Sequence, residues 1–414
     1  MRDGQPCVDI AIEGGRIIDI DPRIDALAPC VIDAGGRAVI PGLLEPHIHL
    51  DKALLESRAP NLSGTLEEAI RITGALKRQQ TREDILDRAR RVLDMAVRNG
   101  TVALRCHPDV DTIQRLIGVE TMLQLKEEYA DLVDLQVVAF PQEGILKAPG
   151  TLDLMREALS MGADVVGGCP YNEASGDAAM AHVDLVFDLA QRSDVDIDMH
   201  ADFSDVATDP RFSAAAYIAR KTIDTGYQGR VTLGHVTSLS AMGAEAASEV
   251  IALLNEADVH VVTLPATDLY LGGRHERTLN PRRGLTPVRA LRDGGVNVAF
   301  SSNNIRNAFT PFGAADPLHI GSLLAHAAHF GSPDDQASVL DMCTHAAARA
   351  MGLAGDYGIE MGKQADLVIL DTHRVADALL DLPARLWVLK RGRVTVETHH
   401  QCRIHREPRE VRAS

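Results

Sequence analysis

The sequence predicts an α/β protein, a (β/α)8 TIM barrel with a small β-sandwich formed by the N- and C-terminal segments. Apolar runs rich in Val, Ile and Leu recur between residues 42 and 304, separated by longer stretches with apolar residues at helical spacing. Short extended segments lie near both ends of the chain, and Gly-Gly pairs interrupt those at the N-terminal end. The length of 414 residues exceeds that of a bare barrel, which is about 250 residues. One barrel plus a smaller module therefore fits the chain.

The apolar runs are the expected barrel strands. They are continuous rather than alternating, which marks strands buried on both faces, as in a parallel sheet covered by helices. Helical patterns such as residues 66–80 and 81–100 come between them, and this alternation is typical of a closed barrel. The runs span residues 42–51, 101–110, 133–142, 163–170, 195–202, 230–238, 259–266 and 296–304.

The two ends of the chain share a pattern of short strands and tight turns. Residues 8–40 contain two Gly-Gly pairs suited to hairpin turns, and residues 365–371 and 385–397 repeat the pattern. Unpaired edge strands are a liability, so we expect both ends to join one β-sandwich rather than form two unrelated appendages. The predicted domains are a sandwich of residues 1–42 and 350–414 and a barrel of residues 43–349.

Composition narrows the function. With 42 Lys and Arg against 58 Asp and Glu, the formal charge of −16 argues against a nucleic-acid or anionic-membrane partner and favours a small neutral or cationic substrate. Six scattered cysteines without a CxxC pair suggest reduced thiols. The N-terminal residues do not resemble a signal peptide, and no apolar stretch is long enough to cross a membrane. We expect a cytoplasmic protein, with a homo-oligomer left open.

Polar side chains gather where the predicted strands end. In TIM barrels the chemistry lies at the carboxyl ends of the strands, so this placement selects candidate site residues. They are His47 and His49 on the first run, His107 and Asp109 on the second, Gln142 on the third, His200 and Asp202 on the fifth, His235 on the sixth, and Asn303 with Asn304 on the eighth.

The histidines predict a metal site. His47 and His49 are two residues apart, so both point to the same side of a strand, although such a pair alone fits ordinary polar residues equally well. Adding His200 and His235 favours one bound divalent metal ion, with zinc and iron the best candidates. A catalytic ion of this kind keeps one position open for water and lowers the pKa of that water toward ~7.

Several longer motifs resemble those of the amidohydrolase superfamily, in particular its cytosine deaminases and N-isopropylammelide isopropylamidohydrolases. The resemblance extends from about residue 8 to residue 395. It implies a metal-dependent hydrolase of a non-peptide C–N bond in a small nitrogen heterocycle or a related amide or amidine. The motifs include PGLLEPHIHLDK (41–52), DLQVVAFPQEGIL (134–146), DVDIDMHAD (194–202), GRVTLGHVTS (229–238) and NIRNAFTPFG (304–313).

The resemblance also implies roles for individual residues. His235 corresponds to the histidine that contacts the metal-bound water or the substrate. Gln142 matches a glutamine that hydrogen-bonds the pyrimidine ring, and Lys52 matches a lysine of the triazine enzymes. The implied metal ligands are His47, His49 and His200.

Two positions depart from these relatives. Asn303 stands where they have an aspartate that binds metal and takes a proton from water, and Phe203 replaces a proton-shuttling glutamate of cytosine deaminases. An amide oxygen can coordinate a cation but cannot accept a proton at neutral pH. We therefore expect His235 to act as the base, with Asp202 as an orienting or proton-carrying group. The alternative for Asp202 is a helix cap or a salt bridge.

The same departures motivate a different functional class. A catalytically silent barrel kept for ligand binding would tolerate Asn303 and Phe203. The enzyme is favoured because a decayed site would not be expected to keep all four histidines and Gln142.

Overall fold

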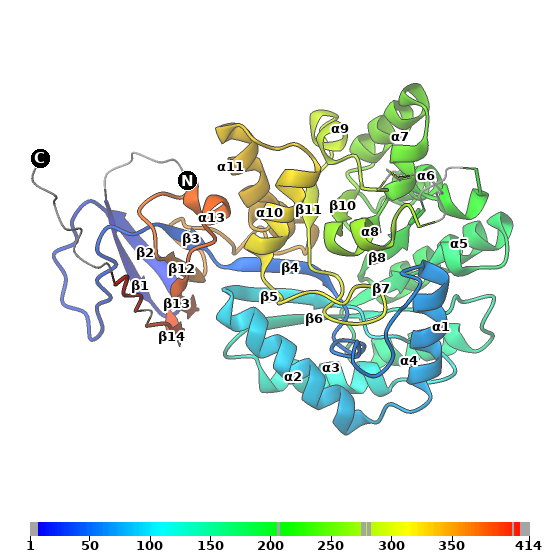
Figure 1. Cartoon of the computed structure of the whole chain (residues 1–414), viewed down its shortest axis with the longest axis horizontal. Helices are drawn as coiled ribbons and strands as arrows, with labels where there is room; N and C mark the ends of the chain where they lie inside the picture. The colour runs from blue at the N-terminus through cyan, green and yellow to red at the C-terminus, as the bar shows by residue number, and fades with distance from the viewer. Residues whose placement is uncertain (1–6, 205–207, 275–278, 280–282, 400, 406–414) are drawn as a thin grey trace, which may run out of the picture.

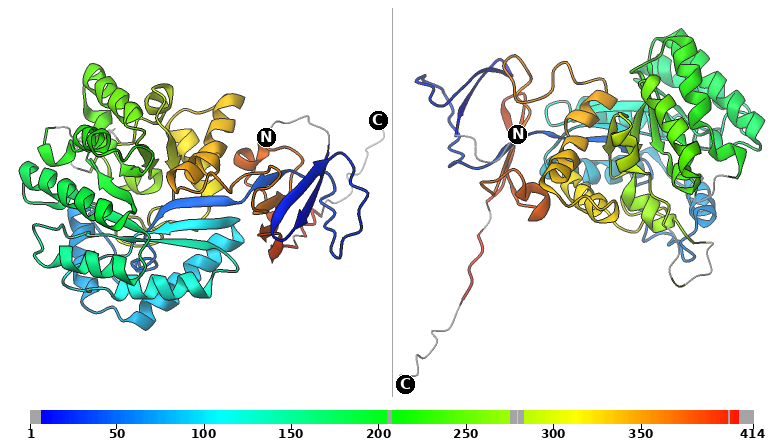
Figure 2. Two further views of the ribbon diagram at one scale, coloured as in Figure 1. Left: turned by 180° about the vertical axis from the view of Figure 1, so that it is seen from behind. Right: turned by 90° about the horizontal axis from the view of Figure 1, so that it is seen from above.

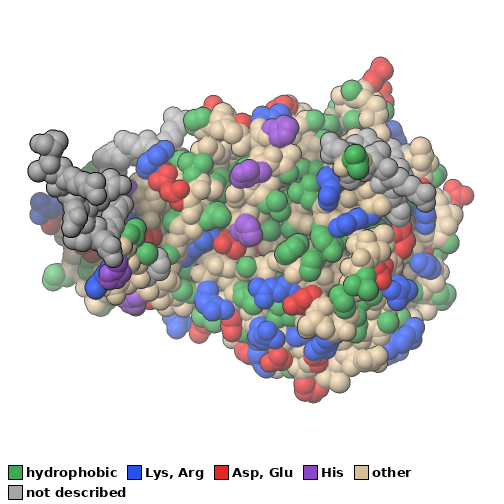
Figure 3. Space-filling view, viewed as in Figure 1, with side chains coloured by type: hydrophobic (Ala, Val, Ile, Leu, Met, Phe, Trp, Pro, Cys, Tyr) green, Lys and Arg blue, Asp and Glu red, His purple; other side chains and the backbone are tan. Residues whose placement is uncertain are grey.

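A computed structural model describes residues 7–204, 208–274, 279, 283–399 and 401–405. The larger part is a barrel of strands enclosed by helices, and a smaller β-rich part lies beside it (Figure 1). Acidic and basic side chains are interspersed over the face shown in Figure 3. Among the residues described, none of the helices combines the length and the apolar character needed to cross a bilayer.

The barrel contains a parallel sheet of 8 strands in sequential order. Hydrogen bonds from His49 N to Asn303 O, 2.8 Å, and from Asn303 N to His47 O, 3.1 Å, join the last strand to the first. Each predicted run contains one strand, so the predicted barrel is confirmed. The strands are β4 (Leu43–Ile48), β5 (Thr101–Cys106), β6 (Asp134–Ala139), β7 (Val165–Gly168), β8 (Asp196–Ala201), β9 (Val231–His235), β10 (His260–Thr263) and β11 (Val298–Phe300).

Helices cover the outside of the barrel (Figures 1 and 2). Several begin at a Thr or Ser whose side chain accepts a backbone N–H of the first turn, as Thr65, Thr81 and Ser175 do. The helices are α1 (Leu66–Lys77), α2 (Arg82–Arg98), α3 (Ile117–Glu128), α4 (Thr151–Met161), α5 (Gly176–Ser193), α6 (Ala215–Thr225), α7 (Ala244–Glu256), α8 (Pro265–Leu271), α9 (Val288–Asp293), α10 (Pro317–Ala327), α11 (Pro333–Met342) and α12 (His345–Ala350).

Both ends of the chain form the smaller part, which confirms the predicted β-sandwich. One sheet has the order β14-β13-β12-β3, and the hairpin β1-β2 packs against it through Ile17, Leu367 and Leu389. The predicted domain boundaries remain a prediction, and residues 1–6 and 406–414 lie outside the described chain. The elements are β1 (Asp9–Glu13), β2 (Arg16–Asp21), β3 (Val39–Pro41), β12 (Leu367–Leu370), α13 (Asp377–Leu380), β13 (Arg385–Lys390) and β14 (Arg393–Glu397).

The chain turns sharply where several barrel strands end. Asp202, His235 and Asn303 have φ values of 53°, 74° and 59°, in the left-handed region that few non-glycine residues adopt. Immediately before His235, Gly234 leaves room for a neighbouring side chain. A Cβ atom there would lie 2.9 Å from Cε1 of His47. Strand β9 can therefore carry no side chain at this position without displacing His47.

We expect Gly234→Ala to destabilise the protein by about 1–3 kcal/mol, because the added methyl group overpacks a buried site. Gly355→Ala is the matched control, since a Cβ at Gly355 meets nothing within 4 Å. Its effect should stay within about 0.5 kcal/mol. Denaturant-induced unfolding measures both, and equal effects of the two substitutions would contradict this role of Gly234.

Candidate active site

Three imidazoles from two strands converge at the carboxyl end of the barrel. Nε2 of His200 on β8 lies 3.0 Å from Nε2 of His47 and 3.1 Å from Nε2 of His49 at the end of β4. All three side chains are buried. Burial, and then the neighbouring His107, lower the pKa of His47 to about 3, so its ring is neutral, as a metal ligand requires.

This cluster fits a divalent metal ion. The three nitrogens lie within 4.8 Å of one another and come from neutral imidazoles, which are good ligands for zinc and iron. Two nitrogens that each lie ~2.0–2.1 Å from one tetrahedral zinc ion are about 3.4 Å apart, slightly more than the observed 3.0 and 3.1 Å. The structure thus brings together the three histidines that the sequence singled out as metal ligands.

A buried carboxylate, which the sequence analysis missed, lies behind His47. Asp198 Oδ1 is 3.7 Å from Nδ1 of His47 and 3.1 Å from Nε2 of His107, and Arg105 donates to Oδ2 at 2.9 Å. The His107 ring stacks on His47, with centroids 3.9 Å apart. Asp198 is two residues before His200 on β8, so the spacing rule that paired His47 with His49 could have found it.

His235 also has a carboxylate partner that sequence reasoning missed. Its Nδ1 lies 2.7 Å from Oδ1 of Asp268, a buried residue of α8. The remaining ring nitrogen, Nε2, is left for the cavity, which His235 lines. Phe203 stacks on the same ring with centroids 4.2 Å apart. Asp268 follows strand β10 inside a helix, so no strand-end pattern pointed to it.

Asp202 makes contacts typical of a helix cap. Its carboxylate accepts backbone N–H groups of Ala214, 2.7 Å, and Ala215, 3.0 Å, where α6 begins. Burial raises the pKa of Asp202 to about 6. Of the two interpretations that the sequence left open, these contacts favour the cap, and a role in proton transfer remains a prediction.

Asn303 lines the cavity as an unpaired amide. Its side chain is buried, and neither Oδ1 nor Nδ2 has a hydrogen-bond partner in the described part of the chain. Leaving a buried polar group unpaired costs about 1–3 kcal/mol, so such a group marks a place where a ligand makes the missing contact. The amide shares the cavity with His49, His200 and His235.

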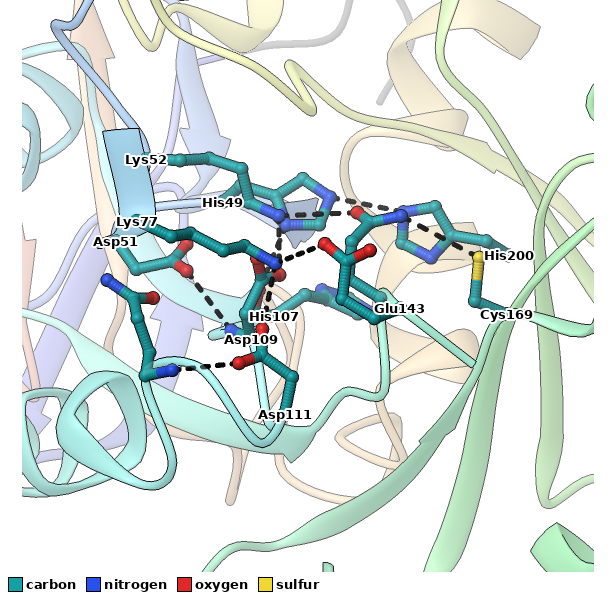
Figure 4. Close-up of polar contacts among 12 residues, drawn as sticks. His49, Asp51, Lys52, Lys77, His107, Asp109, Asp111, Glu143, Cys169 and His200 are labelled. Carbon is teal, nitrogen blue, oxygen red and sulfur yellow. Dashed lines mark hydrogen bonds and ion pairs between the residues drawn. The ribbon is translucent and has the colours of Figure 1, made fainter. Parts of the chain in front are cut away.

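The two predicted substrate-binding residues contact each other. Lys52 Nζ donates to Oε1 of Gln142 at 3.3 Å and forms an ion pair of 2.5 Å with Oδ1 of Asp109 (Figure 4). Gln142 Nε2 in turn donates to Sγ of Cys169 at 3.7 Å. Lys52 and Gln142 therefore form one polar wall of the cavity.

The cavity is small, and both polar and apolar side chains line its other sides. The aromatic rings of Tyr171, Phe203 and Phe309 and the aliphatic side chains of Leu66 and Ile70 line it. Aromatic and aliphatic side chains of this kind can pack against the faces of a planar ring.

Known proteins share this architecture along nearly the whole chain. A model of the amidohydrolase family matches residues 30–396. N-isopropylammelide isopropyl amidohydrolase of Pseudomonas sp. (strain ADP) is 32% identical over 398 residues, covering 94% of this chain and 93% of that protein.

Solved structures agree with these matches. A 5-methylcytosine deaminase from Klebsiella pneumoniae, liganded with phosphonocytosine, has a TM-score of 0.92 and 33% identity, covering 98% of both chains. N-isopropylammelide isopropylaminohydrolase from Burkholderia multivorans has a TM-score of 0.81 and 31% identity, covering 94% of both chains. The catalytically silent alternative is not favoured. These matches show that the chain belongs to the amidohydrolase family and hydrolyses carbon–nitrogen bonds other than peptide bonds.

Proposed function

We propose that this protein is a metal-dependent aminohydrolase of a pyrimidine-like or triazine-like ring. It replaces an exocyclic amino or alkylamino group with oxygen and releases ammonia or an amine. The observation that carries this proposal is that Nε2 of His200 lies 3.0 Å from Nε2 of His47 and 3.1 Å from Nε2 of His49, while His49, His200 and His235 line one small cavity. The relatives named for 5-methylcytosine and N-isopropylammelide indicate the class of ring.

His47, His49 and His200 would hold one divalent ion, with zinc and iron as the candidates. Such an ion, when bound, lowers the pKa of a water toward ~7 and so supplies the nucleophile. Asp198, 3.7 Å from Nδ1 of His47, helps to orient that ring. The unpaired amide of Asn303 offers a further oxygen beside the three rings.

His235 moves the protons of the reaction. Because Asp268 accepts the proton on Nδ1, Nε2 carries a free electron pair toward the cavity. Nε2 accepts a proton from the attacking water as the carbon–oxygen bond forms. It then donates that proton to the leaving nitrogen as the carbon–nitrogen bond breaks. The His235–Asp268 pair thus takes the proton-accepting role that the amide of Asn303 cannot perform.

The remaining cavity residues hold the ring. Lys52 and Gln142 offer polar contacts to its edge, and Phe203 and Tyr171 pack against its apolar surface. By the resemblance, Phe203 replaces a carboxylate of the cytosine deaminases. In our scheme His235 alone carries the proton from the water to the leaving nitrogen. A cytoplasmic location, the absence of nucleic-acid partners and a homo-oligomer remain predictions from the sequence.

We expect the zinc- or iron-loaded protein to release ammonia from cytosine or 5-methylcytosine, or isopropylamine from N-isopropylammelide. Exhaustive chelation should abolish this activity and re-addition of the ion should restore it. His200→Ala should lose bound metal, whereas His326→Ala, on the exposed surface of α10, should retain it. Amine release and elemental analysis measure these outcomes, and full activity after chelation would refute the proposal.

We expect Asp268→Asn to lower kcat by about 100-fold or more, because the amide no longer favours the His235 tautomer with a free Nε2. Asp202→Asn tests the competing assignment with the same chemical change. If Asp202 is a cap, its substitution acts on stability rather than on kcat. Steady-state kinetics and thermal unfolding of both variants decide, and a larger kcat loss for Asp202→Asn would reverse the assignment.

We expect Asn303→Asp to retain metal longer in the presence of a chelator, because the added negative charge beside three imidazoles attracts a cation. The wild type should already turn over substrate, and the substitution should reduce that turnover by disturbing a working site. Metal loss over time and kcat measure the two effects. Activity found only in the variant would support the catalytically silent alternative.

A further inference from the structure

We propose that Lys77 is a positioning residue that holds Lys52 and Gln142 in place and so determines which edge of the substrate the cavity accepts. This inference rests on the proposed function. Lys77 is the last residue of α1 and does not line the cavity. Its ammonium group nonetheless pairs with Asp109, which also pairs with Lys52, and with Glu143, the chain neighbour of Gln142 (Figure 4).

Lys77 is buried among three carboxylates. Its Nζ lies 2.7 Å from Oδ2 of Asp109, 2.8 Å from Oδ2 of Asp111 and 2.7 Å from Oε1 of Glu143. Only 3% of the residue is exposed. Burial opposes the charge, but these carboxylates raise the pKa of Lys77 above its ordinary value. Its ammonium group therefore stays charged and holds three separate segments together.

Asp109 links Lys77 to Lys52, because its carboxylate pairs with both ammonium groups. One carboxylate oxygen, Oδ1, pairs with Lys52 at 2.5 Å, and the other, Oδ2, pairs with Lys77. Asp109 is fully buried, and its backbone N–H donates to Oδ2 of Asp51 at 3.1 Å. Because Lys77 attracts one oxygen of the shared carboxylate, Lys52 does not have to neutralise Asp109 alone. Its ammonium group remains available to donate into the cavity.

Glu143 links Lys77 to Gln142, because it pairs with Lys77 and is the neighbour of Gln142 in the chain. The ion pair with Lys77 fixes the side chain that follows Gln142, and Asn172 Nδ2 donates to the Gln142 carbonyl at 2.6 Å. The Gln142 side-chain amide is oriented at both ends, because Oε1 accepts from Lys52 and Nε2 donates to Cys169. Lys77 thus braces both members of the polar wall.

Lys52 gives this wall a charged hydrogen-bond donor, and no carboxylate of the described chain faces the cavity beside it. None of the residues lining the cavity in the described chain is Asp or Glu, and Lys52 is its one ammonium group there. Such a wall selects a ring edge that carries acceptors, such as an oxo oxygen or a deprotonated ring nitrogen. Without Lys77, Asp109 would pair with Lys52 alone, and the stronger attraction would hold the Lys52 ammonium group away from the cavity.

The test compares crystal structures and kinetics of the zinc-loaded wild type and Lys77→Met. We expect the Lys52–Gln142 contact to be lost in the variant. KM for 5-methylcytosine should rise by roughly 10-fold or more, as expected for a weakened charged hydrogen bond, with kcat changed much less. Lys77→Arg, which keeps the charge, should recover part of the affinity. An intact contact, or an unchanged KM, would overturn the inference.

A matched control separates positioning from general stability. Lys390, the last residue of β13, is equally buried and pairs with Asp366 at 2.6 Å and with Asp134 at 2.7 Å. Asp134 begins barrel strand β6, so this ion pair lies at the end of the barrel opposite the cavity. Lys390→Met should lower the thermal unfolding midpoint but leave KM unchanged. If Lys77→Met does not fold, the triple variant Lys77→Met, Asp111→Asn, Glu143→Gln removes two of the unpaired charges and is tested in the same way.

The proposed function and this inference fail differently. A wild type that releases no amine from cytosine, 5-methylcytosine or N-isopropylammelide counts against the proposed substrate class. The Lys52–Gln142 distance in the crystal structures then decides the role of Lys77. If the wild type is active but Lys77→Met and Lys390→Met have the same KM, the proposed function stands and the positioning role is refuted.

Discussion

Closure of the barrel between its first and last strands is the constraint on which the site depends. Asn303, just after strand β11, donates its backbone N–H to the His47 carbonyl and accepts the His49 N–H at its own carbonyl. One residue therefore helps to determine where the two histidines at the end of β4 lie. Parallel strands all end on the same side, which brings His200 to the same place. The ligand cluster therefore follows from barrel closure and needs no dedicated loop.

The carboxylates of this site lie behind the imidazoles rather than in the cavity. Asp198 lies behind His47, and Asp268 holds Nδ1 of His235. In the cytosine deaminases that the sequence resembles, acidic groups face the reacting atoms directly. By that resemblance Asn303 and Phe203 occupy those positions in this chain, and in our proposal Asp268 acts on the cavity through the imidazole of His235. A carboxylate behind a histidine still orients the ring and raises its basicity, which is why the replacement is compatible with hydrolysis.

Most of the fold, and the grouping of His47, His49 and His200, could be predicted from the sequence because strand ends and residue spacing are local patterns. Their role as metal ligands remains a prediction. Continuous apolar runs located the barrel strands, and the spacing of His47 and His49 placed both rings on one side. Asp268 and Lys77 escaped notice because each lies in a helix, where an acidic or basic residue usually faces solvent. The cap contacts of Asp202 depend on where α6 begins in space, which the strand pattern does not determine.

The position of the buried charges bears on the substrate more directly than the overall charge does. The formal charge of −16 suggested a neutral or cationic substrate, yet the described lining of the cavity contains Lys52 and no Asp or Glu. A cationic ring would meet an ammonium group there without a carboxylate to pair with. Because Coulomb attraction falls with distance and with screening by water, the adjacent charges outweigh the distant acidic surface. The cavity therefore disfavours a cationic ring and suits one that presents oxo or ring-nitrogen acceptors to Lys52.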